Sequence, residues 1–230
     1  PPGTFKYAGP NSYLLGMIAE HRGGNRLNTL YQEKLLESLS IQAVLLPRIE
    51  IPPGMASPYD DRSGYGGSSG FGDLTQIPIF SDVNFIKADA RLSWAAAGIV
   101  STPENMARWA YELFSAKGSA VSPEVRAQLT SSFREATISL GGAPQKYGYH
   151  IALKQHRLSD GSYVTTYGHP GGGAGYASAL FYAPSLDLAI SISTNSDFGY
   201  LLGTCASRSE NWLNPFDCIT RDFFESVLRK

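Results

Sequence analysis

The sequence has almost no net charge and no long apolar run, and both absences limit the classes of function. Its 230 residues include 19 Lys and Arg against 20 Asp and Glu, for a formal net charge of −1. Neither sign gathers into a run that would follow a phosphate backbone, so we expect no nucleic-acid partner. No apolar stretch approaches the roughly 18 residues needed to cross a bilayer, so the sequence predicts no membrane span.

Cysteine is scarce, because only Cys205 and Cys218 are present. A disulfide between them would close a polar, loop-like segment and contribute about 3 kcal/mol in an oxidising compartment. Two reduced thiols are the alternative. The disulfide would favour a secreted or periplasmic location, and the sequence otherwise leaves the location unknown.

Metal-binding patterns are also missing. The chain has no H-E-x-x-H and no paired Cys-x-x-Cys, and His21, His150 and His156 are scattered without the spacing of metal ligands. We therefore expect no metal and no cofactor, and assign these three histidines no role.

Helical patterns are present in the first 140 residues. Asn11 is placed to cap a helix that would bury Leu14, Leu15, Ile18 and Ala19 and end at Gly23–Gly24. Three further helices are expected. One spans 26–39, one begins at a capping box formed by Ser101 and Glu104, and one begins at Ser122. Between them, residues 47–89 are rich in Pro, Gly, Ser and Asp and predict a long loop, which is either the lining of a pocket or a poorly ordered insertion.

Beyond residue 145 the apolar period changes to two, which is typical of strands. Strands are predicted over 147–154, 162–167, 176–183 and 186–194, with the HPGGGAG stretch as a turn. In the last strand one face carries small residues, and we expect the C-terminal helix to pack there through a stripe of apolar residues. The small residues are Ala189, Ser191 and Ser193, and the stripe is Ile219, Phe223, Val227 and Leu228. The predicted fold class is α+β, an antiparallel sheet flanked by helices.

Two stretches carry residues suited to catalysis. His169 precedes Gly171, Gly172 and Gly173, whose bare backbone would let a ligand approach and would offer N–H donors of the kind that an oxyanion hole needs. The alternative is a purely structural turn. Tyr7 stands just before a helix, where a phenol acts as a general base only if a nearby cation lowers its pKa. The alternative is a tyrosine that only packs.

Three segments together resemble the serine β-lactamase-like superfamily, which comprises class C β-lactamases, DD-peptidases and related esterases. They are PPGTFKY followed by NSYLLGMIAE, then AAAGIVSTPENMARW, and finally YGHPGGGAGYASALFYAPSLDLAISISTNSD. The resemblance implies a single β-lactamase-like domain of which residues 1–230 are the C-terminal part, incomplete at the N-terminus. A helical and loop region would span about 1–140, and a sheet with a C-terminal helix about 145–230.

The resemblance also implies roles for individual residues. The family's nucleophile is a serine in an S-x-x-K pair, but no serine stands three residues before any lysine of this chain. We therefore expect an N-terminal segment of the same protein to supply that pair. Tyr7 would match the tyrosine that works with the lysine to deprotonate the serine, His169 the first residue of the third motif, and Gly172 a donor of the oxyanion hole.

Two departures from the family pattern bear on the substrate. Gly9 stands where the second motif has asparagine, so its amide is lost unless Asn11 reaches the substrate, and His169 replaces a lysine. Both favour an esterase or peptidase over a potent β-lactamase. The expected enzyme is a serine hydrolase that acts through an acyl-enzyme on a small-molecule or peptide substrate. The alternatives are a non-catalytic binding or scaffolding protein of this fold, and an accidental resemblance with a structural glycine turn.

Overall fold

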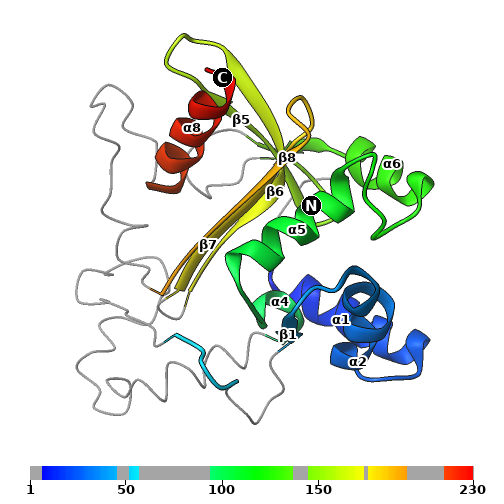
Figure 1. Ribbon diagram of the computed structural model, residues 1–230. Helices are drawn as coiled ribbons and strands as arrows, with labels where there is room; N and C mark the ends of the chain where they lie inside the picture. Colours follow the sequence, from blue (N-terminus) through cyan, green and yellow to red (C-terminus); the bar gives the residue numbers. More distant parts are fainter. Residues whose placement is uncertain are drawn as a thin grey trace.

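The computed structural model describes residues 7–45, 52–56, 94–136, 145–173, 176–195 and 215–229. A small helical part lies beside a six-stranded antiparallel sheet that has a helix on each face, which confirms the predicted α+β class (Figure 1). Nearly all of the loop predicted over 47–89 lies outside the described residues, and so does Cys205. Cys218 is disulfide-bonded, but its pairing with Cys205 stays a prediction. No helix in the described part of the chain is long and apolar enough to cross a membrane.

The helical part begins with α1, whose boundaries differ slightly from the prediction. Its N-cap is Gly9 and Pro10 is the first helical residue, so Asn11 lies inside the first turn and does not cap the helix. Gly24 ends it at φ 64°, as the Gly-Gly signal predicts. The helical elements of this part are α1 (Pro10–Gly23), α2 (Leu27–Tyr31), the π-helical turn η1 (Gln32–Leu36), the 3-10 turn η2 (Glu37–Leu39) and α4 (Trp94–Ala97). The helix predicted over 26–39 is thus continuous but changes its winding.

α1 packs through its smallest residue, which was not expected. Gly16 is buried, and a Cβ atom there would lie 2.7 Å from Cβ of Ala95 on α4. The apolar residues Leu14, Leu15, Met17 and Ile18 are instead 54–59% exposed. The predicted buried stripe of α1 is therefore wrong for Leu14, Leu15 and Ile18, because contact with α4 requires a residue without a side chain.

The sheet contains six strands, two more than predicted, in the order β3-β4-β5-β6-β7-β8 with every neighbouring pair antiparallel. The strands are β3 (Arg134–Ala136), β4 (Gln145–Gly148), β5 (Ile151–Arg157), β6 (Tyr163–Gly173), β7 (Tyr176–Ala183) and β8 (Leu188–Thr194). Two short strands, β1 (Ala43–Leu45) and β2 (Ile99–Ser101), pair separately. The predicted strand 147–154 is divided by a turn at Tyr149–His150, and residues 169–173 continue β6 where a turn was expected.

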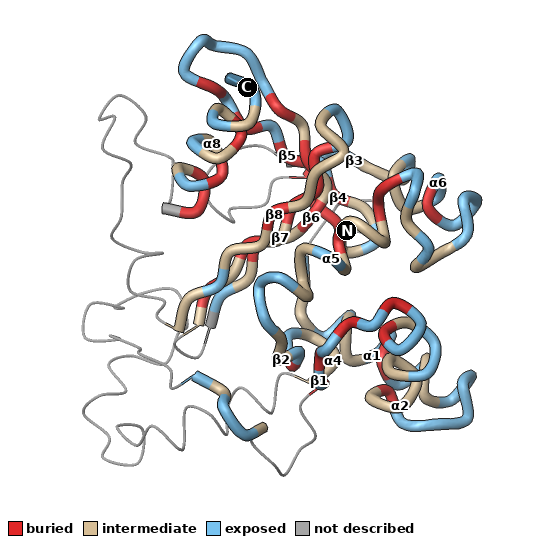
Figure 2. Tube along the Cα trace, viewed as in Figure 1, coloured by how far each residue is buried: buried red, intermediate tan, exposed pale blue. Residues whose placement is uncertain are grey.

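The two faces of the sheet are covered by different helices, α5 (Pro103–Phe114) and α8 (Pro215–Leu228), and most strand residues are buried or half-buried (Figure 2). α5 packs Ala110 and Phe114 against the face that carries Ala189. α8 packs Phe216 and Phe224 against the face of Leu188 and Ile190. The prediction that the C-terminal helix covers the small-residue face is therefore wrong.

The stripe predicted for α8 is wrong at two of its four positions, whereas Phe223 does pack against the core. Ile219 and Leu228 are 49% and 51% exposed, whereas Phe216, Thr220 and Phe224, spaced four residues apart, are buried. This spacing places the buried residues on one side of the helix.

Serine and threonine side chains begin the two helices that follow the helical part. Thr102 caps α5 by accepting a hydrogen bond from the Asn105 N–H, so the predicted cap at Ser101 is wrong by one residue. Ser101 belongs to β2 and donates to the Gln42 carbonyl. Ser122 caps the short helix α6 (Pro123–Ser131), as predicted.

Two polar contacts join the helices to the sheet. On the α8 side, Lys154 of β5 forms an ion pair with Asp217, and the two side chains are 4% and 3% exposed. On the α5 side, Asp187 in the β7–β8 turn accepts hydrogen bonds from the end of α5 and from Tyr182. The donors at and just after the end of α5 are Tyr111 at 3.3 Å, Ser115 at 2.6 Å and Lys117 at 2.7 Å, and Tyr182 donates at 2.8 Å.

Candidate active site

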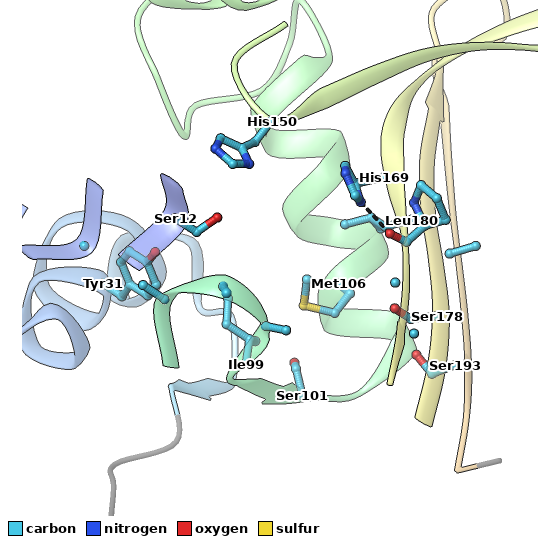
Figure 3. Close-up of a pocket in the computed structure, with 18 of the residues that line it drawn as sticks. Ser12, Tyr31, Ile99, Ser101, Met106, His150, His169, Ser178, Leu180 and Ser193 are labelled. Atoms are coloured by element: carbon cyan, nitrogen blue, oxygen red, sulfur yellow. Dashed lines mark hydrogen bonds between the residues drawn. The ribbon is translucent and has the colours of Figure 1, made fainter. Parts of the chain in front are cut away.

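A cavity of about 930 Å³ lies between the helical part and the sheet (Figure 3). Its lining comes from helices α1, α2, α4 and α5 and from strands β2, β6, β7 and β8, with Tyr7 and His150 from the connecting segments. Among the described residues that line it there is no Asp, Glu, Lys or Arg, while the polar lining includes Ser12, Ser101, Ser178, Ser191 and Ser193. The site therefore offers a ligand hydroxyls, imidazoles and apolar surface.

Four aromatic rings gather at one end of the cavity. Tyr7 lies 5.8 Å from His169, 6.0 Å from Tyr147 and 6.5 Å from His150, measured between ring centroids. Tyr7 is far from His169 in sequence, so the fold brings together two of the residues that the sequence singles out. Tyr147 and His150 join them although the sequence assigned them no role.

Both ring nitrogens of His169 have partners within the protein. Nδ1 faces the Pro170 carbonyl, which only accepts, so Nδ1 carries a proton and donates (dashed in Figure 3). Nε2 lies 2.9 Å from the Tyr147 hydroxyl. Burial lowers the pKa of His169 below its ordinary value. The neutral imidazole therefore accepts from Tyr147, whose own pKa is raised by burial and by the nearby Tyr7.

The glycine-rich end of β6 has a free edge on the β5 side, as far as the described strands are concerned. The pairing of β5 with β6 ends at Ala152 and Gly168, whereas β7 accompanies β6 to Gly173. Within a strand, the backbone groups of residues i and i+2 point to the same side. Pro170 has no N–H to donate to β7, and its carbonyl accepts from the His169 side chain. The carbonyl of Pro170 therefore points away from β7. The N–H of Gly172 consequently points to the free edge.

The glycines of β6 differ in how much space surrounds them. A Cβ atom at Gly168 would lie 1.9 Å from the Leu180 carbonyl oxygen, and one at Gly171 would lie 2.6 Å from Ser178 Oγ. At Gly172 the nearest atom would be 4.0 Å away. Gly171 and Gly172 both line the cavity, and Gly172 is exposed, so its backbone is open to a ligand.

The remaining predicted residues lie at or outside the margin of the site. Asn11 is exposed and is absent from the described lining, where Ser12 is the nearest residue in sequence. Gly173 ends β6 opposite Tyr176. A Cβ atom at Gly9 would meet nothing within 4 Å, so the absence of asparagine there has no packing cause.

Several lining residues were missed at the sequence level. Ser191 and Ser193 stand on the small-residue face of β8, and their alternation was a usable signal, but that face was assigned to a helix. His150 had no signal, because its turn was included in a predicted strand. The described residues contain no group of three or more His, Cys, Asp or Glu side chains arranged to hold a metal ion.

Comparison with known proteins gives the family. The model of the family described as Beta-lactamase matches residues 1–202. The chain belongs to the beta-lactamase family. No functionally curated protein matches this beta-lactamase family member.

Solved structures share the fold at low sequence identity. The D-amino acid amidase from Ochrobactrum anthropi SV3 in complex with D-phenylalanine has a TM-score of 0.71 at 16% identity, over 100% of this chain and 60% of the amidase. A D-stereospecific amidohydrolase from Streptomyces sp. has a TM-score of 0.64 at 18% identity, covering 86% and 52%. A penicillin-binding protein from Bacillus halodurans has a TM-score of 0.61 at 15% identity, over 85% of this chain and 53% of that protein. The chain thus spans little more than half the length of these structures and shares their fold.

Proposed function

We propose that this beta-lactamase family member is the C-terminal part of a serine hydrolase that acts through an acyl-enzyme on an amide, ester or peptide bond. One observation carries the proposal: Tyr7, His169 and the free edge of β6 at Gly172 meet at one cavity. In the proposed mechanism the serine oxygen attacks the carbonyl carbon and Tyr7 takes its proton. The Gly172 N–H binds the oxyanion, the leaving group departs with a proton, and water then hydrolyses the acyl-enzyme.

His169 has an orienting role in this proposal. Both of its nitrogens are engaged within the protein, so it supports the ring of Tyr7 and the Pro170 backbone without transferring a proton itself. We infer that its neutral state adds no positive charge beside Tyr7 beyond that of the lysine of the S-x-x-K pair. The solved amide hydrolases of similar fold support an amide as the bond that is cleaved.

The S-x-x-K pair is proposed to come from a segment outside these 230 residues. The exposed apolar residues of α1, Leu14, Leu15, Met17 and Ile18, form a surface of the kind that a further part of a domain or a partner buries. The share of the similar structures that this chain covers, 52–60%, agrees with an additional segment.

The proposal is tested on the protein as encoded, including whatever precedes these residues. We expect a fluorophosphonate to label one serine and a chromogenic amide to be hydrolysed. Tyr7→Phe is expected to lower kcat by roughly 10²–10⁴-fold, the usual contribution of a general base. Tyr163→Phe is the matched control, because Tyr163 is 58% exposed on β6 and lies outside the described cavity lining. Equal rates for the two variants would remove Tyr7 from the mechanism.

A second candidate is a binding protein of this fold without catalysis. The absence of any S-x-x-K pair from the 230 residues favours it. Mass spectrometry after incubation with a fluorophosphonate or a penicillin separates the two candidates. A covalent adduct on the encoded protein excludes the binding protein, whereas ligand binding without an adduct excludes the hydrolase.

A further inference from the structure

The turn between β4 and β5 holds two bulky residues in an unfavourable backbone conformation. Tyr149 and His150 have φ values of 47° and 59°, in the left-handed region that residues other than glycine seldom occupy. Gly148 pairs with Ile151, so Tyr149 and His150 form a two-residue hairpin turn, which requires a positive φ at both positions. Tyr149 is 67% exposed, whereas His150 is half-buried and lines the cavity. The turn therefore directs the imidazole, and not the phenol, into the site.

The imidazole of His150 is available to a ligand. No hydrogen bond involves its ring in the described part of the structure, whereas both nitrogens of His169 are engaged. The rings of Tyr7 and Tyr147 lie 6.5 Å and 6.3 Å from it. Figure 3 draws His150 between Ser12 and His169, at the same end of the cavity as the His169 ring.

The rest of the described lining offers no competing charge. It contains no Lys or Arg to bind an anion and no Asp or Glu to bind a cation. On the neighbouring strands, Lys146 forms an ion pair with Glu135 at 3.0 Å. Of the described lining, an anionic group of a substrate would meet only hydroxyls, backbone amides and the His150 imidazole, which always has at least one N–H donor.

We propose that His150 is a specificity-determining residue that binds a carboxylate of the substrate, with the Ser12 hydroxyl as a second donor. The proposal rests on the proposed function for its site, but concerns recognition and not bond cleavage. A hydrogen bond to a charged oxygen in a half-buried site contributes enough for a difference of about tenfold in affinity.

The test uses two probes that differ only in charge, 3-phenylpropionate and 3-phenylpropionamide. Their dissociation constants are measured by titration calorimetry on the encoded protein and on variants. His150→Gly is the main variant, because glycine adopts a positive φ without strain and keeps the turn. His150→Asn is the second, since asparagine tolerates this conformation but has a shorter side chain. His21→Gln is the control, because His21 is exposed on α1.

We expect the wild type and His21→Gln to bind the carboxylate at least about tenfold more tightly than the amide, and both His150 variants to lose this preference. An unchanged preference in His150→Gly, or none in the wild type, overturns the proposal. Neither measurement needs a nucleophile. Loss of hydrolysis with the preference intact would therefore count against the proposed function alone.

Discussion

At the scale of single residues, Gly168 and Gly172 are both glycines of β6 for opposite reasons. Gly168 has no space for a side chain, because the Leu180 carbonyl would lie 1.9 Å from a Cβ atom. Gly172 has space, but a methyl group there would occupy the approach to its N–H. The first glycine is required by packing and the second by access.

This difference predicts opposite outcomes for two alanine substitutions. Gly168→Ala is expected to lower the free energy of unfolding by about 1–3 kcal/mol through overpacking. Gly172→Ala is expected to leave that free energy nearly unchanged and to reduce kcat/KM by about 10²-fold, because the reacting carbonyl is displaced. Denaturant unfolding and steady-state kinetics on both variants check this. A destabilised Gly172→Ala with unchanged kinetics would reverse the assignment.

The residues of the candidate site divide by how they could be recognised. Tyr7 and His169 stand in motifs with a local sequence signature, and the fold places them together. Tyr147 and His150 reach the site because a two-residue turn interrupts the period-two pattern of residues 147–154. That pattern does not reveal the turn, because positions 149 and 150 lack the Asn-Gly or Asp-Gly pair that marks a two-residue hairpin.

At the scale of elements, Asp187 fixes α5 to the turn between β7 and β8. Its carboxylate accepts from Ser115, Lys117 and Tyr182, and the Lys117 bond is the main reason that the pKa of Asp187 lies far below its ordinary value. Since the pKa is lowered in the folded state, the carboxylate stabilises the fold above the unfolded pKa of about 3.9, and that stabilisation is lost as pH falls through the folded pKa.

Asp187→Asn is therefore expected to lower the thermal midpoint at pH 7. The difference from the wild type should shrink steadily as the pH falls below about 4, where the native carboxylate begins to lose its advantage. Thermal melts across this range measure it, with Asp222→Asn on the exposed side of α8 as the control. A difference that does not vary with pH would show that Asp187 acts through shape alone.

Elements with local signals were predicted best. Ser122 begins α6 and Gly24 ends α1, because caps depend on neighbouring residues. Which helix covers which face of the sheet was predicted wrongly, because that depends on contacts between distant segments. The small residues of β8 do accept a helix, but it is α5, and beyond it Ser191 and Ser193 open onto the cavity.

At the scale of the whole molecule, the side of the sheet away from the cavity contains a buried histidine. His156 is 4% exposed between the rings of Phe181 and Phe224, and its Nε2 lies 2.9 Å from the Thr166 hydroxyl. Burial, with the positive charge of Lys154, lowers its pKa to about 3. The unfolded chain, with a histidine pKa near 6.5, thus binds a proton that the folded protein does not.

The protein is therefore expected to lose stability as the pH falls from about 6.5 towards 3, by up to about 1.4 kcal/mol per pH unit from this residue. His156→Gln keeps a polar partner for Thr166 and should flatten this slope, even if packing losses lower stability at every pH. Urea unfolding at a series of pH values compares it with His21→Gln, which should retain the wild-type slope. Parallel slopes in all three proteins would assign the acid sensitivity elsewhere.

The ion pair between Lys154 and Asp217, which joins the sheet to α8, also limits how this fold can diverge. Removing one partner leaves the other buried charge without its counter-ion and costs about 3–5 kcal/mol, a large share of the stability of a typical domain. Replacing both with apolar residues is often neutral. A substitution at only one of the two positions therefore destabilises the fold. Homologous proteins are expected either to keep both charges or to have replaced both, so that the two positions change together.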